Sequence, residues 1–487
     1  MKVLSVEQIR NAERTAVLSG LFSYADLMKN AGKAVFEEIA GRYAIVGKRF
    51  LILAGSGNNG GDGLVLAGLL HNSGALVELY LPFGPPRTDT ARVFAESVSN
   101  IPLCNQITDS YDFYVDALFG IGLDRPLSPE TENLINFVNS LDGVKISVDI
   151  PSGIIADSGR AQAVFKADLT VTFIGYKLSQ LLPETSDFCG EVVLNDLGID
   201  TKNDYSYSVI DPPKPRKFSK NSHKGTFGTA LAVCGSYGMC GAAVLSAKAA
   251  AVSGAGIVKA VICDKNYSAF THSVPEAVTV PVETSADGAP IIYEKTALSA
   301  LSGAAALLIG CGLGTTDAAK NAVKKFLKVT DIPTVIDADG INALADNIDI
   351  LRSIRAPYVL TPHPGEMARL FGTTVGDIEA HRVQYAKKFA CHYNCVLVLK
   401  GANTVVAAPN GEVYFNITGN YGMAKGGAGD VLSGIIVALL ANGYNTLDAA
   451  LTAVYVHGAA GDRAARKFTK RTMLPSDILG ELKFISF

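Results

Sequence analysis

Residues 422–443 read Gly-Met-Ala-Lys-Gly-Gly-Ala-Gly-Asp-Val-Leu-Ser-Gly-Ile-Ile-Val-Ala-Leu-Leu-Ala-Asn-Gly. The glycine-rich segment 426–429 precedes a run, 431–441, that is apolar on nearly every face and predicts a buried helix. Backbone N–H groups at the start of such a helix suit a phosphate group. Asp430 stands at this start, where its carboxylate could take a proton from a hydroxyl that attacks phosphorus. The alternative, of equal weight, is a tight loop into a core helix with Asp430 as its N-cap.

The composition describes a well-packed protein with more than one domain. The chain has 487 residues, which suggests about two to three domains. A net charge of −3 gives no electrostatic reason to expect nucleic acid, and no apolar run reaches about 18 residues, so we expect no membrane partner either. The N-terminus enters a polar helix without a signal peptide, and the eight cysteines are typical of reduced thiols, so we expect a cytoplasmic protein.

Strands alternate with helices through the first half of the chain, which predicts a parallel sheet covered on both faces. Capping-box spacings after Ser5 and Ser23 open two helices that reach Leu18 and Ala40. The further elements that the pattern predicts are strands at 50–54, 75–81, 113–118, 145–150 and 169–174, and helices at 64–70, 88–99 and 129–141. In such sheets, ligands bind at the carboxyl ends of the strands.

Polar side chains follow several of these strands in the loops 55–63, 116–122 and 149–153. Asn59, Asp116 and Ser152 would bring three oxygen ligands to one edge, a set that suits a hard cation of low charge. Each residue alone also has a local explanation, as an Asx-turn, a strand-end cap or a turn serine. Because three loops share one edge, we favour a binding site.

These three loops resemble the YjeF N-terminal domain, the NAD(P)H-hydrate epimerase family, over about residues 1–210. The resemblance implies that Asn59, Asp116 and Ser152 hold a potassium ion. Asp149 is our candidate for the acid/base carboxylate, and Lys177 is a second candidate. Members without catalysis are known in this family, so the fold alone does not decide activity. The residues that the resemblance assigns to the hydrated substrate are Asn58, Asn59, Gly60, Gly61 and Asp62, then Gly120, Ile121, Gly122, Leu123, Asp124, Arg125 and Pro126 of a closing loop, and Asp149.

The alternation breaks at residue 211. Three prolines within residues 211–215 predict an extended, semi-rigid spacer. We therefore expect a domain at 1–210, a linker at 211–222 and a second domain at 223–487.

The second half predicts another αβ sheet. Its expected strands are 229–234, 257–263, 304–309, 334–337, 358–361 and 396–399. His363 lies between two prolines after one strand, where a structural role and a ligand contact are equally weighted. Lys400 ends the last strand, where it is either a solvated tip or a cation near phosphates.

The runs 223–228, 361–366 and 400–404, with the Gly-Asp turn, resemble ribokinase-like kinases and, more narrowly, the ADP/ATP-dependent NAD(P)H-hydrate dehydratase family over residues 220–487. The resemblance implies that Gly256, Gly314, His363 and Asp430 face the hydrated cofactor. The residues that it assigns to the adenine nucleotide are Lys400, Gly401, Ala402, Asn403 and Thr404, then Asn420, Tyr421, Gly422, Met423, Ala424, Lys425, Gly426, Gly427, Ala428 and Gly429.

The two resemblances together predict two doubly wound α/β domains, a Rossmann-like one followed by a ribokinase-like one. The first domain would interconvert the R and S hydrates of NADH and NADPH. The second would dehydrate the S hydrate at the expense of ADP or ATP with a magnesium ion, and release phosphate. The apolar helices lead us to expect a homo-oligomer. The alternative is a ribokinase-like kinase of a small alcohol, such as a vitamin precursor, with a non-catalytic N-terminal binding module.

Overall fold

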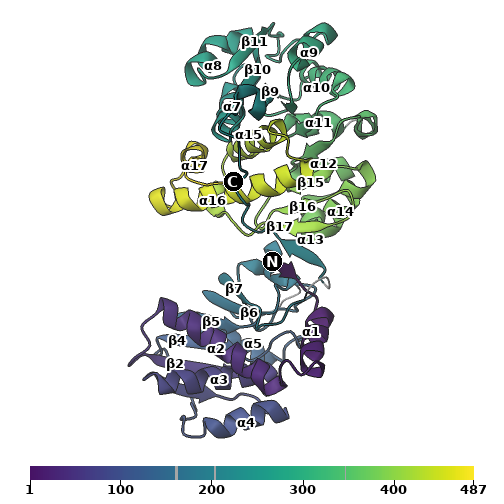
Figure 1. Ribbon diagram of the computed structural model, residues 1–487. Helices are drawn as coiled ribbons and strands as arrows, with labels where there is room; N and C mark the ends of the chain where they lie inside the picture. Colours follow the sequence, from purple (N-terminus) through teal and green to yellow (C-terminus); the bar gives the residue numbers. More distant parts are fainter. Residues whose placement is uncertain (160–162, 202–204, 346) are drawn as a thin grey trace. The chain divides into compact units, whose positions relative to one another are not determined.

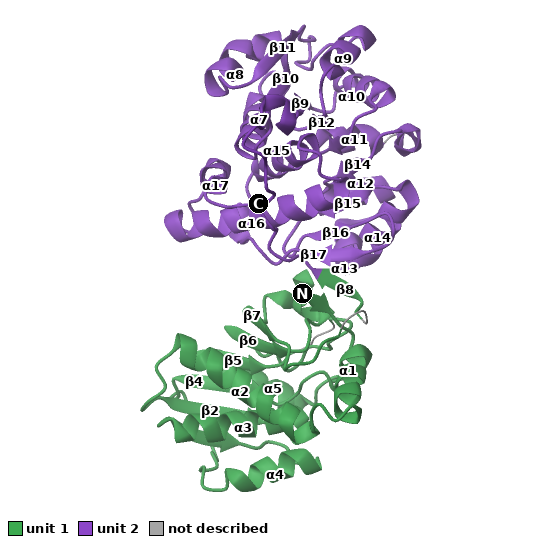
Figure 2. Ribbon diagram, in the orientation of Figure 1, with its two compact units in different colours: residues 1–208 green, residues 209–487 purple. Residues whose placement is uncertain are grey.

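The computed structural model describes the whole chain except residues 160–162, 202–204 and 346 (Figure 1). The chain divides into two compact units, residues 1–208 and 209–487 (Figure 2). Each unit is described by itself below. Within the described part of the chain, none of the helices combines the length and apolarity needed to cross a bilayer.

Unit 1 contains a parallel sheet with the strand order β3-β2-β4-β5-β6-β7. The strands of this sheet are β2 (Arg49–Ala54), β3 (Leu76–Tyr80), β4 (Phe113–Ala117), β5 (Val144–Val148), β6 (Leu169–Phe173) and β7 (Glu191–Asn195). Outside it, β1 (Lys2–Val3) pairs with the antiparallel strand β8 (Tyr207–Val209). The helices of unit 1 are α1 (Val6–Leu18), α2 (Tyr24–Arg42), α3 (Asn58–Asn72), α4 (Asp89–Ser97), α5 (Pro129–Ser140) and α6 (Pro183–Ser186). The predicted parallel sheet is confirmed, and both capping boxes, at Ser5 and Ser23, are present.

The start of α3 differs from the prediction, which began the helix at Leu64. The helix begins at Asn58, so the polar segment after β2 is its first turn rather than a loop. Glycines permit this because the helix starts against the strands: a Cβ at Gly60 would lie 1.8 Å from the Gly55 carbonyl oxygen, and one at Gly63 would lie 2.6 Å from Ala117 Cβ. The strand β7 was not predicted.

Unit 2 contains a sheet with the order β17-β16-β15-β14-β13-β12-β9-β10-β11, parallel from β15 to β11. The strands β16 and β17 are antiparallel. The strands are β9 (Thr229–Val233), β10 (Ile257–Cys263), β11 (Val278–Val282), β12 (Ala306–Ile309), β13 (Thr334–Ile336), β14 (Tyr358–Leu360), β15 (Val396–Leu399), β16 (Val405–Ala407) and β17 (Val413–Phe415). The helices are α7 (Cys240–Val252), α8 (Tyr267–Ser273), α9 (Glu294–Leu301), α10 (Asp317–Val329), α11 (Asp339–Ala345), α12 (Pro364–Phe371), α13 (Val375–Ala380), α14 (Arg382–Tyr393), α15 (Ala428–Ala441), α16 (Thr446–Phe468) and α17 (Pro475–Leu482).

The predicted buried helix of the C-terminal half is α15. It packs against α7 and α16 and against the strands β9 and β12 (Figure 1). From Val431 to Ala441 each of its residues is buried, as the all-round apolar pattern indicated. Glycine makes the contact with α7 close, since a Cβ at Gly434 would lie 2.3 Å from the Ser246 carbonyl oxygen.

Residues 211–222, the expected linker, form no helix or strand but belong to unit 2, and Arg216 contacts the rest of that unit. Its guanidinium donates to the Asn442 carbonyl oxygen at 2.8 Å and lies 5.3 Å from the centre of the Tyr444 ring. These contacts hold the segment against the loop that follows α15.

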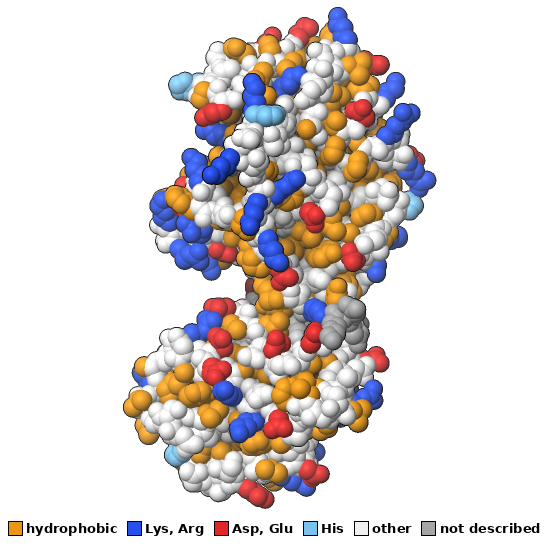
Figure 3. Space-filling view, in the orientation of Figure 1, with side chains coloured by type: hydrophobic (Ala, Val, Ile, Leu, Met, Phe, Trp, Pro, Cys, Tyr) orange, Lys and Arg blue, Asp and Glu red, His pale blue; other side chains and the backbone are white. Residues whose placement is uncertain are grey.

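The surface of the chain mixes charges of both signs. Figure 3 shows Lys and Arg side chains interspersed with Asp and Glu on the visible face. The last turn of α16 is basic, with Arg466 and Lys467. This mixture agrees with the small net charge of −3.

Candidate active sites

The first candidate site lies at the carboxyl edge of the unit 1 sheet. Asp116, the fourth residue of β4, is fully buried and accepts hydrogen bonds from Ser152 Oγ at 2.6 Å and Ser152 N at 2.7 Å. Burial raises the pKa of the Asp116 carboxyl to about 6, although the Ser152 hydrogen bonds oppose the rise. The structure thus brings together two of the three residues expected to hold a cation.

The third expected ligand, Asn59, is a half-buried residue whose side-chain Oδ1 and Nδ2 atoms are buried and lack a partner among the described residues. A Cβ at Gly120 would lie 3.2 Å from Asn59 Oδ1 and 3.2 Å from Asp149 Oδ2, so these groups border one point. Leaving a buried amide unsatisfied costs about 1–3 kcal/mol, so these two atoms favour a polar partner at this point. An unpartnered amide oxygen beside a buried carboxylate and a serine hydroxyl fits a monovalent cation.

Asp149 directly follows β5 and takes a left-handed backbone conformation, with φ of 70°. The fully buried Lys177 ammonium donates to Asp149 Oδ1, to Thr172 Oγ1 at 2.7 Å and to the Phe173 carbonyl oxygen at 3.1 Å. Gln180 Nε2 holds the Asp149 carbonyl oxygen at 2.9 Å. One carboxylate oxygen is thereby committed to Lys177, while the other borders Gly120.

Two further carboxyl groups lie near Asp149: Glu13, which the sequence prediction missed, and Asp62, which it named only as a substrate contact. Glu13 comes from α1, and its pKa is raised by burial and by the charge of Asp149. Burial, and then Asp149 and Glu13, raise the pKa of Asp62 well above its usual value. Sequence reasoning had no signal for Glu13, because it lies far along the chain from the three strand ends.

The expected closing loop after β4 is mostly exposed. Leu123 is buried and donates to the Gly120 carbonyl oxygen at 3.3 Å, whereas Gly122, Asp124, Arg125 and Pro126 are exposed. Of the two glycines in this loop, Gly120 borders the group formed by Asn59 and Asp149, whereas Gly122 has open space around it. Closure of this loop over a ligand therefore stays a prediction.

The second candidate site lies at the start of α15 in unit 2. The N-cap is Gly427, in a left-handed conformation with φ of 101° and no side-chain cap. Asp430 is the third residue of the helix, so the alternative prediction of Asp430 as the N-cap is wrong. The helix begins earlier because glycine can adopt the cap conformation that other residues rarely adopt. Ala428 N, the first N–H of the helix, donates to the Lys425 carbonyl oxygen at 3.2 Å. The next two N–H groups, of Gly429 and Asp430, receive no side-chain cap within the described part of the chain and can face an anion.

The carboxyl of Asp430 has a higher pKa than an ordinary aspartate. Burial, and next the charge of Asp337, raise its pKa to about 6, although a hydrogen bond with Cys311 and the charge of Lys400 oppose the rise. A carboxylate with this pKa is a better base than an ordinary aspartate and is still ionised at neutral pH.

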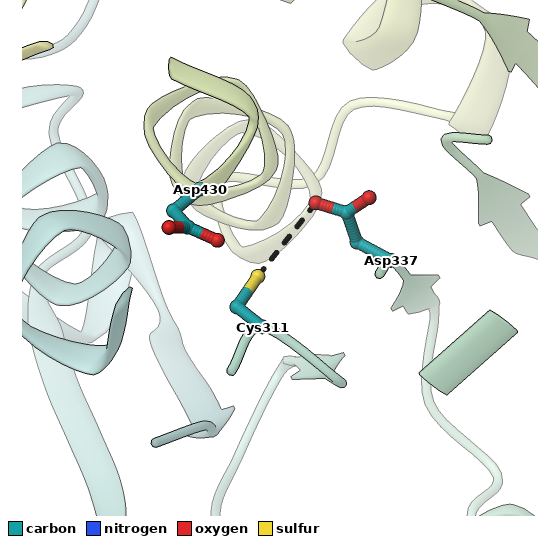
Figure 4. A group of neighbouring side chains, drawn as sticks. All are labelled: Cys311, Asp337 and Asp430. Carbon is teal, nitrogen blue, oxygen red and sulfur yellow. Dashed lines mark hydrogen bonds between the residues drawn. The ribbon is translucent and has the colours of Figure 1, made fainter. Parts of the chain in front are cut away.

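Asp337 and Cys311 approach Asp430 from the ends of β13 and β12 (Figure 4). Their ligand atoms and an Asp430 oxygen lie within 4.8 Å of one another. Asp337 already pairs with the Lys400 ammonium at 2.7 Å and accepts from Ser433 Oγ at 2.7 Å. Burial and these carboxylates raise the pKa of Cys311 well above its usual value, together with a hydrogen bond to Cys234, the largest cause. A neutral thiol and a paired carboxylate do not favour a metal ion at this cluster.

The residues expected to bind the nucleotide fall in two loops. In the first, Lys400 ends β15, and Gly401 packs against the Arg382 guanidinium, which donates to the carbonyl oxygens of Leu399 and Lys400 at 3.1 and 3.2 Å. Arg382, which the sequence prediction missed, therefore fixes the turn. The rest of this loop, Ala402, Asn403 and Thr404, leads into β16.

The second loop, 420–429, is held by a residue that the sequence prediction also missed. Asp462 of α16 accepts from Gly419 N at 2.8 Å and from Asn420 Nδ2 at 2.9 Å. Lys425 Nζ donates to the backbone carbonyls of Arg471, at 2.9 Å, and Met473, so this ammonium supports the loop.

Two roles were expected for His363, a structural one and a ligand contact. The structure shows the structural role, and the ligand contact stays a prediction. His363 is the N-cap of α12, and its Nδ1 accepts from Gly365 N at 2.9 Å. Burial, with the charges of Lys400 and Arg369, lowers the pKa of His363. Gly314 lies at the strand edge, where its N–H donates to Asp339 Oδ2 at 2.7 Å.

Gly256, the fourth residue expected to face the hydrate, is explained by packing. A Cβ there would lie 1.9 Å from the Lys224 carbonyl oxygen. Its contact with a substrate stays a prediction.

The two sites and the two sheets define the class of the protein: an α/β enzyme of two units, each with a candidate site at the carboxyl edge of its sheet. The family model described as NAD(P)H-hydrate dehydratase matches residues 230–483, and the model described as YjeF-related protein N-terminus matches residues 24–179. The chain belongs to the family of bifunctional NAD(P)H-hydrate repair enzymes.

Named relatives match over nearly their whole length. The bifunctional NAD(P)H-hydrate repair enzyme Nnr of Moorella thermoacetica is 36% identical over 100% of this chain and 96% of its own. The enzyme of the same name from Escherichia coli is 36% identical over 98% of this chain and 93% of its own. Among solved structures, the ADP/ATP-dependent NAD(P)H-hydrate dehydratase of Bacillus subtilis, co-crystallised with ATP and Mg²⁺, is 35% identical, covers 56% of this chain and 93% of its own, and has a TM-score of 0.49.

Proposed function

We propose that unit 2 dehydrates the S hydrate of NADH or NADPH with ADP or ATP, and that unit 1 interconverts the R and S hydrates so that both are repaired. Membership of the repair-enzyme family supports this pairing of activities. The observation that carries the chemistry of unit 2 is the position of Asp430, a carboxyl with a pKa of about 6 in the first turn of an uncapped buried helix.

The dehydration follows from this arrangement. Hydroxide is a poor leaving group, so the hydroxyl of the hydrate must first be activated. Asp430 takes the hydroxyl proton as the oxygen attacks the terminal phosphoryl group of ADP or ATP. The N–H groups at the start of α15 stabilise negative charge on the phosphoryl group in transit. Phosphate then leaves, the adjacent ring carbon loses a proton, and the double bond of the nicotinamide ring returns.

The epimerisation is assigned to the Asp149 pair of unit 1. Because Lys177 holds Asp149 Oδ1, the other oxygen is the atom left to exchange a proton with the substrate hydroxyl. The helix start at Asn58–Asp62, whose N-cap Gly57 has no side-chain cap, suits the phosphates of the dinucleotide.

Two metal ions complete the proposal. Asn59, Asp116 and Ser152 would hold a potassium ion, supported by the unpartnered Asn59 amide and the buried Asp116 carboxyl. A bound cation would supply positive charge that keeps Asp116 ionised. Magnesium would accompany the phosphates of the nucleotide in unit 2 and neutralise part of their charge.

The test is recovery of nicotinamide absorbance from separately prepared R and S hydrates, with phosphate release measured and ADP compared with ATP. We expect nucleotide-dependent recovery from the S hydrate, and recovery from the R hydrate that also requires unit 1. A kinase of a small alcohol would instead leave a stable phosphorylated product and restore no absorbance. A non-catalytic unit 1 would leave the R hydrate unrepaired beyond its spontaneous epimerisation.

A further inference from the structure

In the dehydration described above, Asp337 contributes only its charge, which helps to raise the pKa of Asp430. Yet Asp337 is the most completely bonded carboxylate of the second site. Asp337 is 1% exposed and directly follows β13. Its Oδ1 accepts from Ala338 N at 2.9 Å and from Lys400 Nζ at 2.7 Å. Its Oδ2 accepts from Ser433 Oγ at 2.7 Å and lies 3.7 Å from Cys311 Sγ. Donors on four sides fix this carboxylate in one orientation.

Lys400, the partner of Asp337, places its ammonium beside the glycine-rich turn 426–429, which we call the catalytic turn. A Cβ on Gly429 would lie 3.4 Å from Lys400 Nζ and 3.9 Å from Asp337 Oδ2. Gly429 immediately precedes Asp430 and lies at the start of α15, where the backbone N–H groups would stabilise the phosphoryl group in the proposed dehydration. The ammonium therefore lies at the point where negative charge develops during phosphoryl transfer.

A lysine side chain has several rotatable bonds, so its position depends on its partners. Lys400 has a second carboxylate within reach: Glu366 Oε2 is 3.9 Å from its Nζ. Glu366 also accepts from His363 N at 2.8 Å and belongs to the start of α12 rather than to the Gly429 turn. Without Asp337, the remaining attraction would draw the ammonium toward Glu366.

Both members of the pair formed by Asp337 and Lys400 carry their charge at neutral pH. Burial opposes the charge on Asp337, but Lys400 and the hydrogen bonds outweigh it and hold the pKa of Asp337 below its usual value. Burial likewise opposes the charge on Lys400, but Asp337 and Glu366 raise its pKa. A buried ion pair of this kind is weak evidence for stability, because similar apolar groups often stabilise a fold as well. Its position beside Gly429 and Asp430 points to a role in the chemistry of the site.

We propose that Asp337 is a positioning residue of the dehydratase site, which holds the Lys400 ammonium against the Gly429 turn so that this ammonium contacts the phosphoryl group in transit. The inference rests on the proposed dehydration. It assigns to Lys400 stabilisation of the transition state rather than affinity for the nucleotide, and it assigns to Asp337 an effect exerted through Lys400.

The test compares Asp337→Asn, Lys400→Met and the double variant in the full-length chain. We expect each single variant to lower kcat for dehydration of the S hydrate by about 100-fold, the usual effect of losing one charge-stabilising group. The KM for ATP and the Kd for a non-hydrolysable ATP analogue should change by less than about fivefold, because the group acts mainly on the transition state. Adding Asp337→Asn to Lys400→Met should lower kcat by less than about threefold further.

The double variant also separates catalysis from folding. Asp337→Asn alone leaves a buried ammonium without its main partner and should melt at a lower temperature, whereas the double variant leaves neither charge and should regain most of that loss. The double variant should nevertheless stay about 100-fold slow. The exposed carboxylate of Asp349 supplies the matched control, since Asp349→Asn should leave both kcat and the melting temperature unchanged.

Three results would overturn the inference: a double variant with kcat within about fivefold of the unaltered chain, single variants that raise KM without lowering kcat, or full additivity of the two substitutions. If Asp337→Asn alone does not fold, the double variant still decides between these outcomes. If the unaltered chain shows no nucleotide-dependent recovery of absorbance, the proposed function itself fails. If the unaltered chain dehydrates the S hydrate and the variants do so at a similar rate, the roles assigned to Asp337 and Lys400 are wrong, whereas the proposed function stands.

Discussion

The buried ammonium of Lys177 donates a hydrogen bond to Oδ1 of Asp149, and Oδ2 of the same carboxylate lies beside Gly120. The Lys177 side chain is 1% exposed and that of Asp149 is 11% exposed. Asp149 also keeps a strained left-handed backbone, which costs of order 1–3 kcal/mol and persists where surrounding contacts impose it. The two features together fix the carboxylate so that its second oxygen lies beside Gly120, the point that the Asn59 side chain also borders.

The first prediction concerns Asp149. We expect Asp149→Asn to lower the rate of epimerisation by at least about 100-fold, because the substitution removes the base. Dehydration of the S hydrate should keep its rate, since unit 2 has its own site. The measurement is repair of separately prepared R and S hydrates. The exposed Asp109, changed to Asn, is the control, and equal repair of both hydrates by the Asp149 variant would reject the assignment.

The second prediction concerns the cation site. We expect potassium chloride to raise the melting temperature more than tetramethylammonium chloride at the same ionic strength, because the larger cation cannot enter the site. A ligand that binds only the folded state at ten times its Kd stabilises it by about 1.4 kcal/mol. Asn59→Ala should abolish the difference between the two salts, since it removes the unpartnered amide oxygen. Identical melting curves for the unaltered chain in both salts would contradict a potassium site.

The third prediction is a pH dependence of dehydration set by Asp430. The pKa of this carboxyl is raised from 3.8 to about 6, so its basic form is lost as the pH falls through 6. We therefore expect kcat/KM for the S hydrate to rise from pH 5 to a plateau above about pH 7. Asp430→Asn should lower the plateau by about 100-fold or more. A rate that is flat between pH 5 and pH 8, or a nearly normal rate in the variant, would remove Asp430 from its role as base.

The fold could be predicted from the sequence because its signals are local. The apolar strands, the capping boxes and the all-round apolar run of α15 each depend on neighbouring residues, and the structure confirms them within a few residues. The start of α3 could not be predicted in this way. Glycines weaken a helix on local grounds, whereas Gly60 and Gly63 are required by close contacts with β2 and β4, which only the folded chain contains.

The candidate sites could be predicted only in part, for a similar reason. Asp116, Asp149 and Asp430 were found because each lies at the end of a strand, directly after a strand, or in the first turn of a helix. Asp337 also follows a buried strand, but its significance depends on Lys400, 63 residues away, and on the lateral order of the strands. A sequence places groups at the edge of a sheet; which of them face one another depends on strand order and side-chain orientation.

The last prediction concerns the packing that fixes the catalytic helix. Gly434 of α15 faces α7, where an added Cβ would lie 2.3 Å from the Ser246 carbonyl oxygen and 2.5 Å from Ala249 Cβ. We expect Gly434→Ala to lower the free energy of unfolding by about 1–3 kcal/mol, because backbone atoms must move apart. Gly480 of α17 has open space around its Cα, so Gly480→Ala should be neutral or stabilising by up to about 1 kcal/mol. Urea unfolding followed by circular dichroism compares the two variants. If both alter the unfolding midpoint equally, the close contact between α15 and α7 does not determine the stability of unit 2.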